Sequence, residues 1–277
     1  MKEFTGKVAV ITGAGRGIGR GIALHCAKEG MKIVLAGIGM ESLTKTAADL
    51  QALGSETLIV QTDVSELADV ERLAEKSFTS FGSVDLLVNN AGVVVQASVL
   101  DCSIEDWNWV MGVNFYGVLY GVRAFIPRMI KQDATCHVVN VSSVAGIGPG
   151  RSTYDVSKHA VVILSEALYH DLANTAPHVK VSVYCPGQVD SEFYRVHNSR
   201  PERFKTNATI PTDKKMADWR KSLSKGFSIE ESARILFDGL QKDKLYIGLK
   251  AFLKQNPETP DIIRNRAENI INELNPE

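Results

Sequence analysis

The chain has 277 residues, 44% of them hydrophobic and 23% charged, and its formal net charge at pH 7 is −1. This composition is typical of a globular protein and gives no reason to expect nucleic acid or an anionic membrane as a partner. No apolar run reaches the roughly 20 residues of a membrane span, and the first residues lack the apolar stretch of a secretory signal. We therefore expect no membrane span and a cytoplasmic location.

Cysteine and histidine are not arranged as metal ligands. The four cysteines, at positions 26, 102, 136 and 185, lie far apart and form no CxxC pair. We interpret them as small buried side chains in a reducing compartment. His170 and His197 have no partners at ligand spacing, so we predict no metal site.

The first expected element is a strand followed by a glycine-rich turn. Residues 7–12 (KVAVIT) form a short apolar run, and Gly13, Gly17 and Gly19 follow before a helical pattern. Such a turn lets the backbone approach a phosphate, which the free N–H groups of the helix N-terminus can bind. The spacing is GxxxGxG, because Ile18 stands where the GxGxxG fingerprint needs a glycine. Taken alone, the turn could equally be a βα connection without a ligand.

Strands and helices then alternate along the chain. The pattern predicts one α/β domain over residues 1–277, a doubly wound parallel seven-stranded sheet (Rossmann fold) with helices on both faces. Ser65 and Ser228 are expected to cap their helices. The further strands are expected at 32–36, 57–62, 84–88, 137–141, 180–184 and 245–249, and helices at 41–53, 65–81, 104–129, from 154 onward, and 228–240.

Two segments depart from this alternation. Residues 190–225 lack periodicity and are too long for an ordinary connection, so we predict a lid or substrate loop there. Residues 250–277 form a C-terminal extension that we expect to pack on the domain or on a neighbouring subunit. One helical face of this extension carries Ile262, Ile263, Ala267, Ile270 and Ile271.

Protic side chains gather in the sequence between residues 142 and 158. The strand at 137–141 delivers Ser142 and Ser143 at its carboxyl end, and Tyr154 and Lys158, four residues apart, share one face of the following helix. The strand at 84–88 runs into the sequence NNAG, whose small and amide residues suit the ligand crevice of an open α/β sheet. These residues predict a site for proton chemistry.

In this order, the glycine turn, NNAG, Ser143 and the Tyr154-xxx-Lys158 pair resemble the short-chain dehydrogenase/reductase family, from about residue 7 to about residue 249. The resemblance implies that Tyr154 is the general acid/base. It implies that Lys158 lowers the pKa of Tyr154 and holds the nicotinamide ribose, and that Ser143 binds the substrate oxygen. Asn114 matches an asparagine that supports a proton relay to the lysine. The family also implies a homodimer or homotetramer.

Two serines compete for the role of the active hydroxyl. Ser143 precedes an xxG step, as in the family, and neighbouring strand residues point to opposite faces, so only one serine can meet Tyr154. Ser142 remains the alternative. The interval between Ser143 and Tyr154 contains GPG and is shorter than usual for the family, so the pocket wall there is expected to differ.

The resemblance also assigns the cofactor-binding positions. Gly37 ends the second strand without a carboxylate to repel a 2′-phosphate, and Arg16 could pair with one. NADP(H) is therefore favoured over NAD(H), although Arg16 would be a solvated side chain if NAD(H) bound. The assigned positions are Thr12, Gly13, Arg16, Gly17, Ile18, Gly19, Asp63, Val64, Asn89, Ala91, Gly92, Tyr154, Lys158, Pro186, Gly187, Val189 and Ser191.

The expected pocket walls are mostly apolar, which predicts a hydrophobic ketone or secondary alcohol as substrate. The 190–225 segment carries nine Lys/Arg against five Asp/Glu, which suits either an acidic substrate or a solvated loop. The competing functions are a dinucleotide-binding regulator without turnover and an isomerase or dehydratase that uses the same base. The wall positions are Val93, Val94, Val95, Gln96, Val144, Ala145, Val189, Phe193 and Tyr194.

Overall fold

The computed structural model describes residues 1–205 and 211–272. Seven strands form one parallel sheet in the order β3-β2-β1-β4-β5-β6-β7, so the strand order reverses between β1 and β4. The register sets Ile11 beside Leu35 on one side and Val88 on the other. The strands are β1 Val8–Thr12, β2 Lys32–Gly37, β3 Thr57–Gln61, β4 Leu86–Asn89, β5 Cys136–Val141, β6 Val179–Tyr184 and β7 Tyr246–Ile247.

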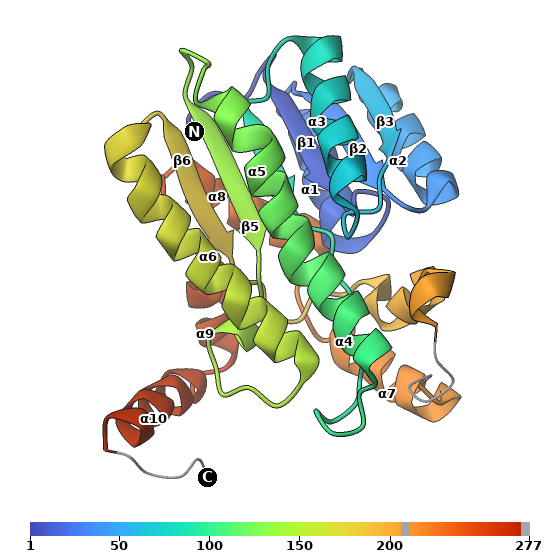
Figure 1. The fold of residues 1–277 in the computed structure, drawn as a ribbon, viewed down its shortest axis with the longest axis vertical. Coiled ribbons are helices and arrows are strands. Elements are labelled where there is room, and N and C mark those ends of the chain that lie inside the picture. Colours follow the sequence, from blue (N-terminus) through green and yellow to red (C-terminus); the bar gives the residue numbers. More distant parts are fainter. Residues whose placement is uncertain (206–210, 273–277) are drawn as a thin grey trace.

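Helices cover both faces of this sheet (Figure 1), and each face has its own apolar core. These two layers confirm the predicted doubly wound fold. One face is covered by α1 Gly17–Lys28, α2 Met40–Ala52 and α8 Ile229–Leu240; the other by α3 Leu67–Phe81, α4 Ile104–Met111, α5 Gly117–Met129 and α6 Thr153–Thr175.

In the central strands β1, β4 and β5 every residue is buried, because successive side chains point to opposite faces and helices cover both. In β1, Val10 belongs to the core beneath α3 and α5, whereas Ala9 and Ile11 belong to the core beneath α1, α2 and α8. Both kinds of position must therefore be apolar, which is why the strands read as continuous apolar runs. The parallel arrangement brings all the carboxyl ends to one edge of the sheet, where the site lies.

The two expected helix caps have different outcomes. Ser228 is the N-cap of α8, and its Oγ accepts a hydrogen bond from the N–H of Glu231 (3.1 Å). The predicted Ser65 cap is wrong, because the Ser65 hydroxyl donates instead to the Asp63 carboxylate (2.6 Å). Helix α3 consequently begins at Leu67.

The helix expected at 104–129 is interrupted by a π-helical turn, η1 Gly112–Tyr116, which separates α4 from α5 and carries Asn114. Such turns are frequent at functional sites. Pro127 lies inside the last turns of α5 and does not end it. By length and composition alone, the stretch Ile104–Met129 could cross a membrane. Half of its most apolar window is buried inside the protein, and a core helix of a globular protein has the same length and composition.

Residues 190–225, where the sequence predicts a lid or substrate loop, contain helical turns in their described part. They form two 3₁₀-helices, η3 Glu192–Ser199 and η4 Glu202–Phe204, followed by α7 Asp213–Leu223. A 3₁₀-helix repeats every three residues, and this period differs from those of strands and α-helices. We call η3, η4 and α7 together the lid.

The C-terminal extension is helical, as predicted, and its two helices differ in their packing. Phe252 of α9 Leu249–Gln255 lies against Gly187, where a Cβ would overlap its ring. Helix α10 Thr259–Ile271 instead projects from the body (Figure 1), and Ile262 and Ile271 are exposed. Of the two predicted packings, packing on the domain is thus found for α9 and not for α10, and packing of α10 on a neighbouring subunit stays a prediction. The Ile270 side chain and residues 273–277 lie outside the described part.

Candidate active site

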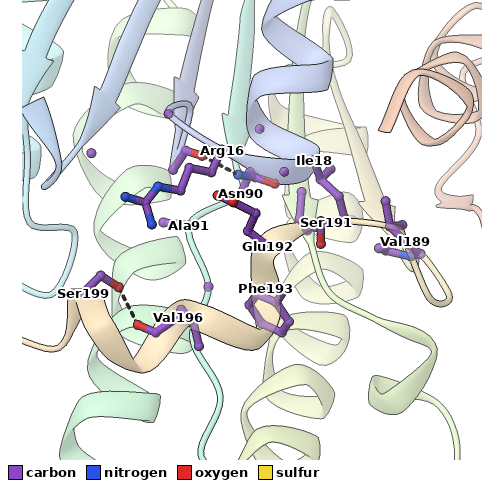
Figure 2. Close-up of a pocket in the computed structure, with 18 of the residues that line it drawn as sticks. Arg16, Ile18, Asn90, Ala91, Val189, Ser191, Glu192, Phe193, Val196 and Ser199 are labelled. Atoms are coloured by element: carbon purple, nitrogen blue, oxygen red, sulfur yellow. Dashed lines mark hydrogen bonds between the residues drawn. The ribbon is translucent and has the colours of Figure 1, made fainter. Parts of the chain in front are cut away.

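A crevice lies at the carboxyl ends of the central strands, and η3 of the lid runs along it (Figure 2). Arg16 and Ile18 reach it from the glycine turn, and Asn90 and Ala91 from the end of β4. Most of the predicted site residues line this one crevice. They are Gly13, Arg16, Gly17, Ile18, Gly19, Ala91, Gly92, Ser143, Tyr154, Lys158, Pro186, Gly187, Val189 and Ser191.

The glycine turn is shaped for the close approach of a ligand. Gly13 and Gly17 have φ of +65° and +51°, a left-handed backbone that other residues rarely adopt. A Cβ at Gly13 would also lie 2.9 Å from the Cα of Ala91. Helix α1 begins at Gly17, so its free N–H groups open on this turn. Together these features fit the pyrophosphate of a dinucleotide.

Thr12 shapes the crevice from beneath and is itself buried. Its Oγ1 accepts hydrogen bonds from the backbone N–H groups of Asn90 (2.9 Å) and Ala91 (3.0 Å). The Asn90 side chain donates in return to the Thr12 carbonyl (2.8 Å). These bonds lock the turn after β4 to the end of β1, so Thr12 positions the ligand-binding turns without lining the crevice.

The predicted catalytic side chains come from α6 and from the end of β5. Ser152 caps α6, and its Oγ accepts a hydrogen bond from the N–H of Asp155 (3.3 Å), which places Tyr154 in the first turn and Lys158 one turn later. The Lys158 Nζ lies 5.6 Å from the centre of the Tyr154 ring and donates to the Val141 carbonyl (2.9 Å). The Ser143 side chain lies close enough to the Tyr154 phenol to lower its pKa. Two hydroxyls and an amine therefore meet at one point of the crevice.

Burial controls the protonation of this group. It raises the pKa of Tyr154 to about 12, against the opposing effect of the Ser143 side chain. Burial also lowers the pKa of Lys158 to about 8. The net shift of the Tyr154 pKa is thus upward and is caused by burial, and the lowering of this pKa by Lys158 that the resemblance implies stays a prediction. At neutral pH the phenol is protonated, which suits it to donate a proton.

Ser142 and Ser143 have different surroundings. The Ser142 side chain is buried, and its Oγ donates to the Lys158 carbonyl (2.8 Å). Ser143 is the N-cap of the short 3₁₀-helix η2 Val144–Gly146, and its Oγ accepts a hydrogen bond from the N–H of Ala145 (3.1 Å). Of the two serines, only Ser143 acts on the pKa of the Tyr154 phenol, whereas the Ser142 Oγ is engaged by the Lys158 carbonyl, so the surroundings favour Ser143.

Asn114 is completely buried in the π turn and does not line the crevice. Its Oδ1 accepts from the N–H of Val93 (2.8 Å), and its Nδ2 donates to the Val93 carbonyl and to the Ser157 Oγ (2.9 Å each). Ser157 precedes Lys158 on α6, and the Cβ that Gly92 lacks would lie 3.7 Å from the Asn114 Oδ1 and 3.4 Å from the Lys158 Nζ. Asn114 thus fixes the wall beside Lys158.

Asp63, Val64 and Asn89 also lie outside the crevice. Val64 is buried in the core, and the Asn89 Nδ2 donates to the Asn140 Oδ1 (2.9 Å) inside the sheet. Burial alone would raise the pKa of the Asp63 carboxyl, but hydrogen bonds from Ser65 and Arg203 bring it below its usual value. The side chains at these three assigned positions therefore make contacts within the fold and do not line the crevice.

The crevice includes residues that the sequence did not single out. At the end where a cofactor ribose would lie, it is lined by Gly37, Ile38, Gly39, Ser42 and Leu43. Gly37 is the last residue of β2, and the other four follow this strand and carry no charge or motif to mark them. The lid adds Glu192, Val196, Ser199 and Leu223. Of these, Val196 and Ser199 share a period of three residues with Phe193.

Some of the expected pocket walls face elsewhere. Val93 and Val95 belong to the core beneath α3 and α5, because the chain after β4 turns inward. Tyr194 lies on the far side of η3, whereas Phe193 lines the crevice, its ring centre 6.2 Å from that of Tyr154. The wall beside Tyr154 is thus made mainly by the lid.

Two arginines hold the lid to the rest of the protein. The Arg200 Nη1 lies 2.6 Å from the Asp106 Oδ1, and these side chains are only 9% and 0% exposed. The Arg200 guanidinium also lies 4.8 Å from the centre of the Trp109 ring. Arg203, 42% exposed, pairs with Asp63 and Glu66 at 2.8 Å each. These two arginines therefore hold the lid through one buried ion pair and two exposed ones.

Metal chemistry has no candidate site in the described residues. No group of three or more His, Cys, Asp or Glu side chains is placed there to hold an ion. The cysteines are unpaired thiols, three of them buried.

Comparison with known proteins gives matches along the whole chain. A family model described as short chain dehydrogenase matches residues 7–202. A Lactiplantibacillus plantarum protein named CLA biosynthesis dehydrogenase/reductase is 32% identical over 100% of this chain and 97% of its own length.

Solved structures match at similar coverage. A short chain dehydrogenase/reductase from Burkholderia phymatum, in complex with NAD, has a TM-score of 0.89 and 39% identity, covering 100% of this chain and 98% of that one. The apo form of LigD from Sphingobium sp. strain SYK-6 has a TM-score of 0.78 and 26% identity, covering 99% of this chain and 100% of that one.

Proposed function

The chain belongs to the short-chain dehydrogenase family, and from that membership we propose that it transfers a hydride between a nicotinamide dinucleotide and an apolar ketone or secondary alcohol. The observation that carries this proposal is the meeting of the Ser143 and Tyr154 hydroxyls beside Lys158, in a crevice whose glycine turn fits a pyrophosphate. Phe193 and Val196 of the lid supply apolar surface on the substrate side of Tyr154.

The proposed chemistry follows from the protonation of these groups. A bound nicotinamide would supply or accept the hydride. In the reducing direction, Ser143 and Tyr154 donate hydrogen bonds to the substrate carbonyl oxygen, where negative charge develops. The neutral phenol of Tyr154 then gives its proton to that oxygen, and the Lys158 ammonium stabilises the resulting phenolate. In the oxidising direction the same proton returns to Tyr154.

We propose that NADP(H) is favoured over NAD(H). The ribose end of the crevice is lined by Gly37, Ile38, Gly39 and Ser42, none of which would repel a 2′-phosphate, and Arg16 is exposed at the N-cap of α1 nearby. A guanidinium can pair bidentately with a phosphate. The Burkholderia phymatum protein was solved with NAD, so both cofactors belong in the test.

The test of cofactor preference is Arg16→Ala, followed by fluorescence titration with NADPH and NADH. We expect NADPH binding to weaken about tenfold, the value of one charge-assisted hydrogen bond, and NADH binding to change little. Arg20→Ala is the matched control, because Arg20 pairs with Asp49 (2.8 Å) outside the crevice. Equal losses for the two cofactors would remove Arg16 from the phosphate assignment.

A spectrophotometric screen of apolar ketones and alcohols with both cofactors tests the function itself. We expect one mole of NADPH or NADH to be consumed for each mole of ketone reduced. A regulator would bind the dinucleotide without turnover, and an isomerase or dehydratase would convert substrate without net cofactor consumption. Either result would replace the proposed reaction.

A further inference from the structure

The lid has a second surface behind the crevice. Because η3 is a 3₁₀-helix, residues three apart share a face, and Phe193 and Val196 accordingly line the crevice. Tyr194 and Arg195 point to the other side, into a groove of ≈ 600 Å³ between η3 and α7. We call it the cationic groove.

Positive charge is concentrated around one aromatic ring of this groove. The guanidinium groups of Arg195 and Arg220 lie 5.3 and 5.9 Å from the centre of the Tyr194 ring, and Lys221 lines the groove beside them. These contacts orient both guanidinium groups, because a cation is attracted to the face of an aromatic ring. Arg195 also reaches the Glu192 carboxylate, at 3.5 Å, and both of these side chains are about half exposed. In the described chain no salt bridge is recorded for Arg220 or Lys221.

The groove also has apolar surface and adjoins the active site. Met216 and Ala217 of α7 line it together with the Tyr194 ring. Phe193 joins the two regions: its ring centre lies 6.2 Å from that of Tyr154 and 5.7 Å from that of Trp219, which it meets edge-on. Trp219 directly precedes Arg220 on α7. An elongated molecule that extends from Tyr154 past the Phe193 and Trp219 rings would therefore approach the Arg220 side of α7.

We propose that the cationic groove binds the anionic group of the substrate, a carboxylate or a phosphate, at the end of an apolar chain whose carbonyl or hydroxyl carbon meets Tyr154. The proposal rests on the oxidoreductase function above and names its substrate class. The apolar chain passes over Phe193 and Trp219, and the acid group exchanges water for the Arg220 and Lys221 donors. A neutral ketone would use only the apolar part of this path.

The kinetic test compares a long-chain keto acid with its methyl ester in the parent and in a variant combining Arg220→Gln with Lys221→Gln. We expect the KM for the acid to rise about three- to tenfold, as for the loss of one or two exposed ionic contacts, with kcat unchanged. The KM for the ester should stay the same. The matched control combines Lys214→Gln with Lys215→Gln, which removes the same charge from α7 outside the groove.

A binding test does not depend on turnover. Trp219, which directly precedes the groove residue Arg220, is an intrinsic fluorescence probe, to be titrated with decanoate, decanol and inorganic phosphate in the parent and both variants. Decanoate should bind to the parent and the control more tightly than decanol, and the groove variant should lose that preference. Added salt should weaken the decanoate signal, because the cations are exposed.

The outcomes separate this inference from the proposed function. If the parent reduces both compounds and the groove variant changes both KM values alike or neither, the groove does not bind the acid group. If phosphate binds as well as decanoate, the groove holds a free anion and the substrate assignment is overturned. If the parent reduces neither compound with either cofactor, the proposed reaction fails for this substrate class, and the decanoate titration alone decides the groove.

Discussion

The crevice is bounded by two regions that are held in place by different contacts. On the sheet side, buried amides and hydroxyls bond to one another: Asn89 donates to Asn140 (2.9 Å), and Asn140 donates to Ser165 (3.0 Å). On the lid side, η3 has no buried residue, and the ionic contacts of Arg200 and Arg203 tie it to the body. The sheet side thus fixes the reacting groups through buried hydrogen bonds, whereas the lid depends on the ion pairs of two arginines.

This difference predicts that the largest loss of activity comes from the sheet side. Tyr154→Phe removes the only group that we propose to move the proton, so kcat should fall at least about 10²-fold. Dinucleotide affinity, measured by fluorescence titration, should be nearly unchanged, because the ring remains. Tyr169→Phe, an exposed position on the same helix, is the control. More than about a tenth of the parent activity in Tyr154→Phe would take Tyr154 out of the mechanism.

The largest loss of lid stability should come from Arg200→Ala. This change leaves the Asp106 carboxylate, 0% exposed, without the cation that lies 2.6 Å away. Breaking a buried pair by removing one partner costs about 3–5 kcal/mol. We expect the free energy of unfolding in urea to fall by about 3 kcal/mol, with a raised KM for any substrate that contacts the lid. A loss below about 1 kcal/mol would show that the pair is not buried in solution.

The sheet side should also be the more sensitive to acid. His137 of β5 is fully buried, with its Nε2 2.8 Å from the Ser182 Oγ, and burial lowers the pKa of His137 to about 3. The unfolded chain binds this proton below its ordinary pKa of about 6.5, whereas the folded protein does not. Stability is therefore complete above about pH 6.5 and falls as the pH decreases towards 3.

The measurement is urea unfolding at pH 7 and pH 5 for the parent and for His137→Gln. The parent should lose about 2 kcal/mol more than the variant over this interval, since each pH unit between the two pKa values contributes about 1.4 kcal/mol. Equal losses would assign the acid sensitivity to other groups.

The two regions also differ in how far the sequence could predict them. Strands of the sheet are buried runs bounded by glycine, and their right-handed crossovers leave few possible orders. The local motifs at or after strand ends contain Gly13, Ser143 and the Tyr154–Lys158 pair. Because the strands are parallel, the sequence predicts that these residues meet at one edge of the sheet. Thr12 and Asn114 are among the exceptions on this side. They support the crevice from beneath, and nothing in the local sequence separates a supporting contact from a lining one.

The lid could not be predicted in the same way. The faces of its 3₁₀-helices repeat every three residues, a period that differs from those of strands and α-helices. The contact of Arg200 with Asp106 joins residues that are far apart in the sequence. A count of basic residues did detect the charge of the segment. It could not show that Arg195 and Arg220 gather at the Tyr194 ring while Arg200 is buried.

The smallest predicted effect belongs to Arg203→Ala and completes the comparison within the lid. Arg203 makes three contacts at 2.8 Å, to Asp63, Glu66 and the Ser65 Oγ, but it is 42% exposed. Water and salt replace exposed ion pairs readily, so the loss should be within about 1 kcal/mol and should vanish at high ionic strength. The Arg200→Ala loss should persist in salt, because water does not reach Asp106. If the two variants respond equally to salt in urea unfolding, burial does not distinguish the two contacts, and the lid is held by its exposed surface.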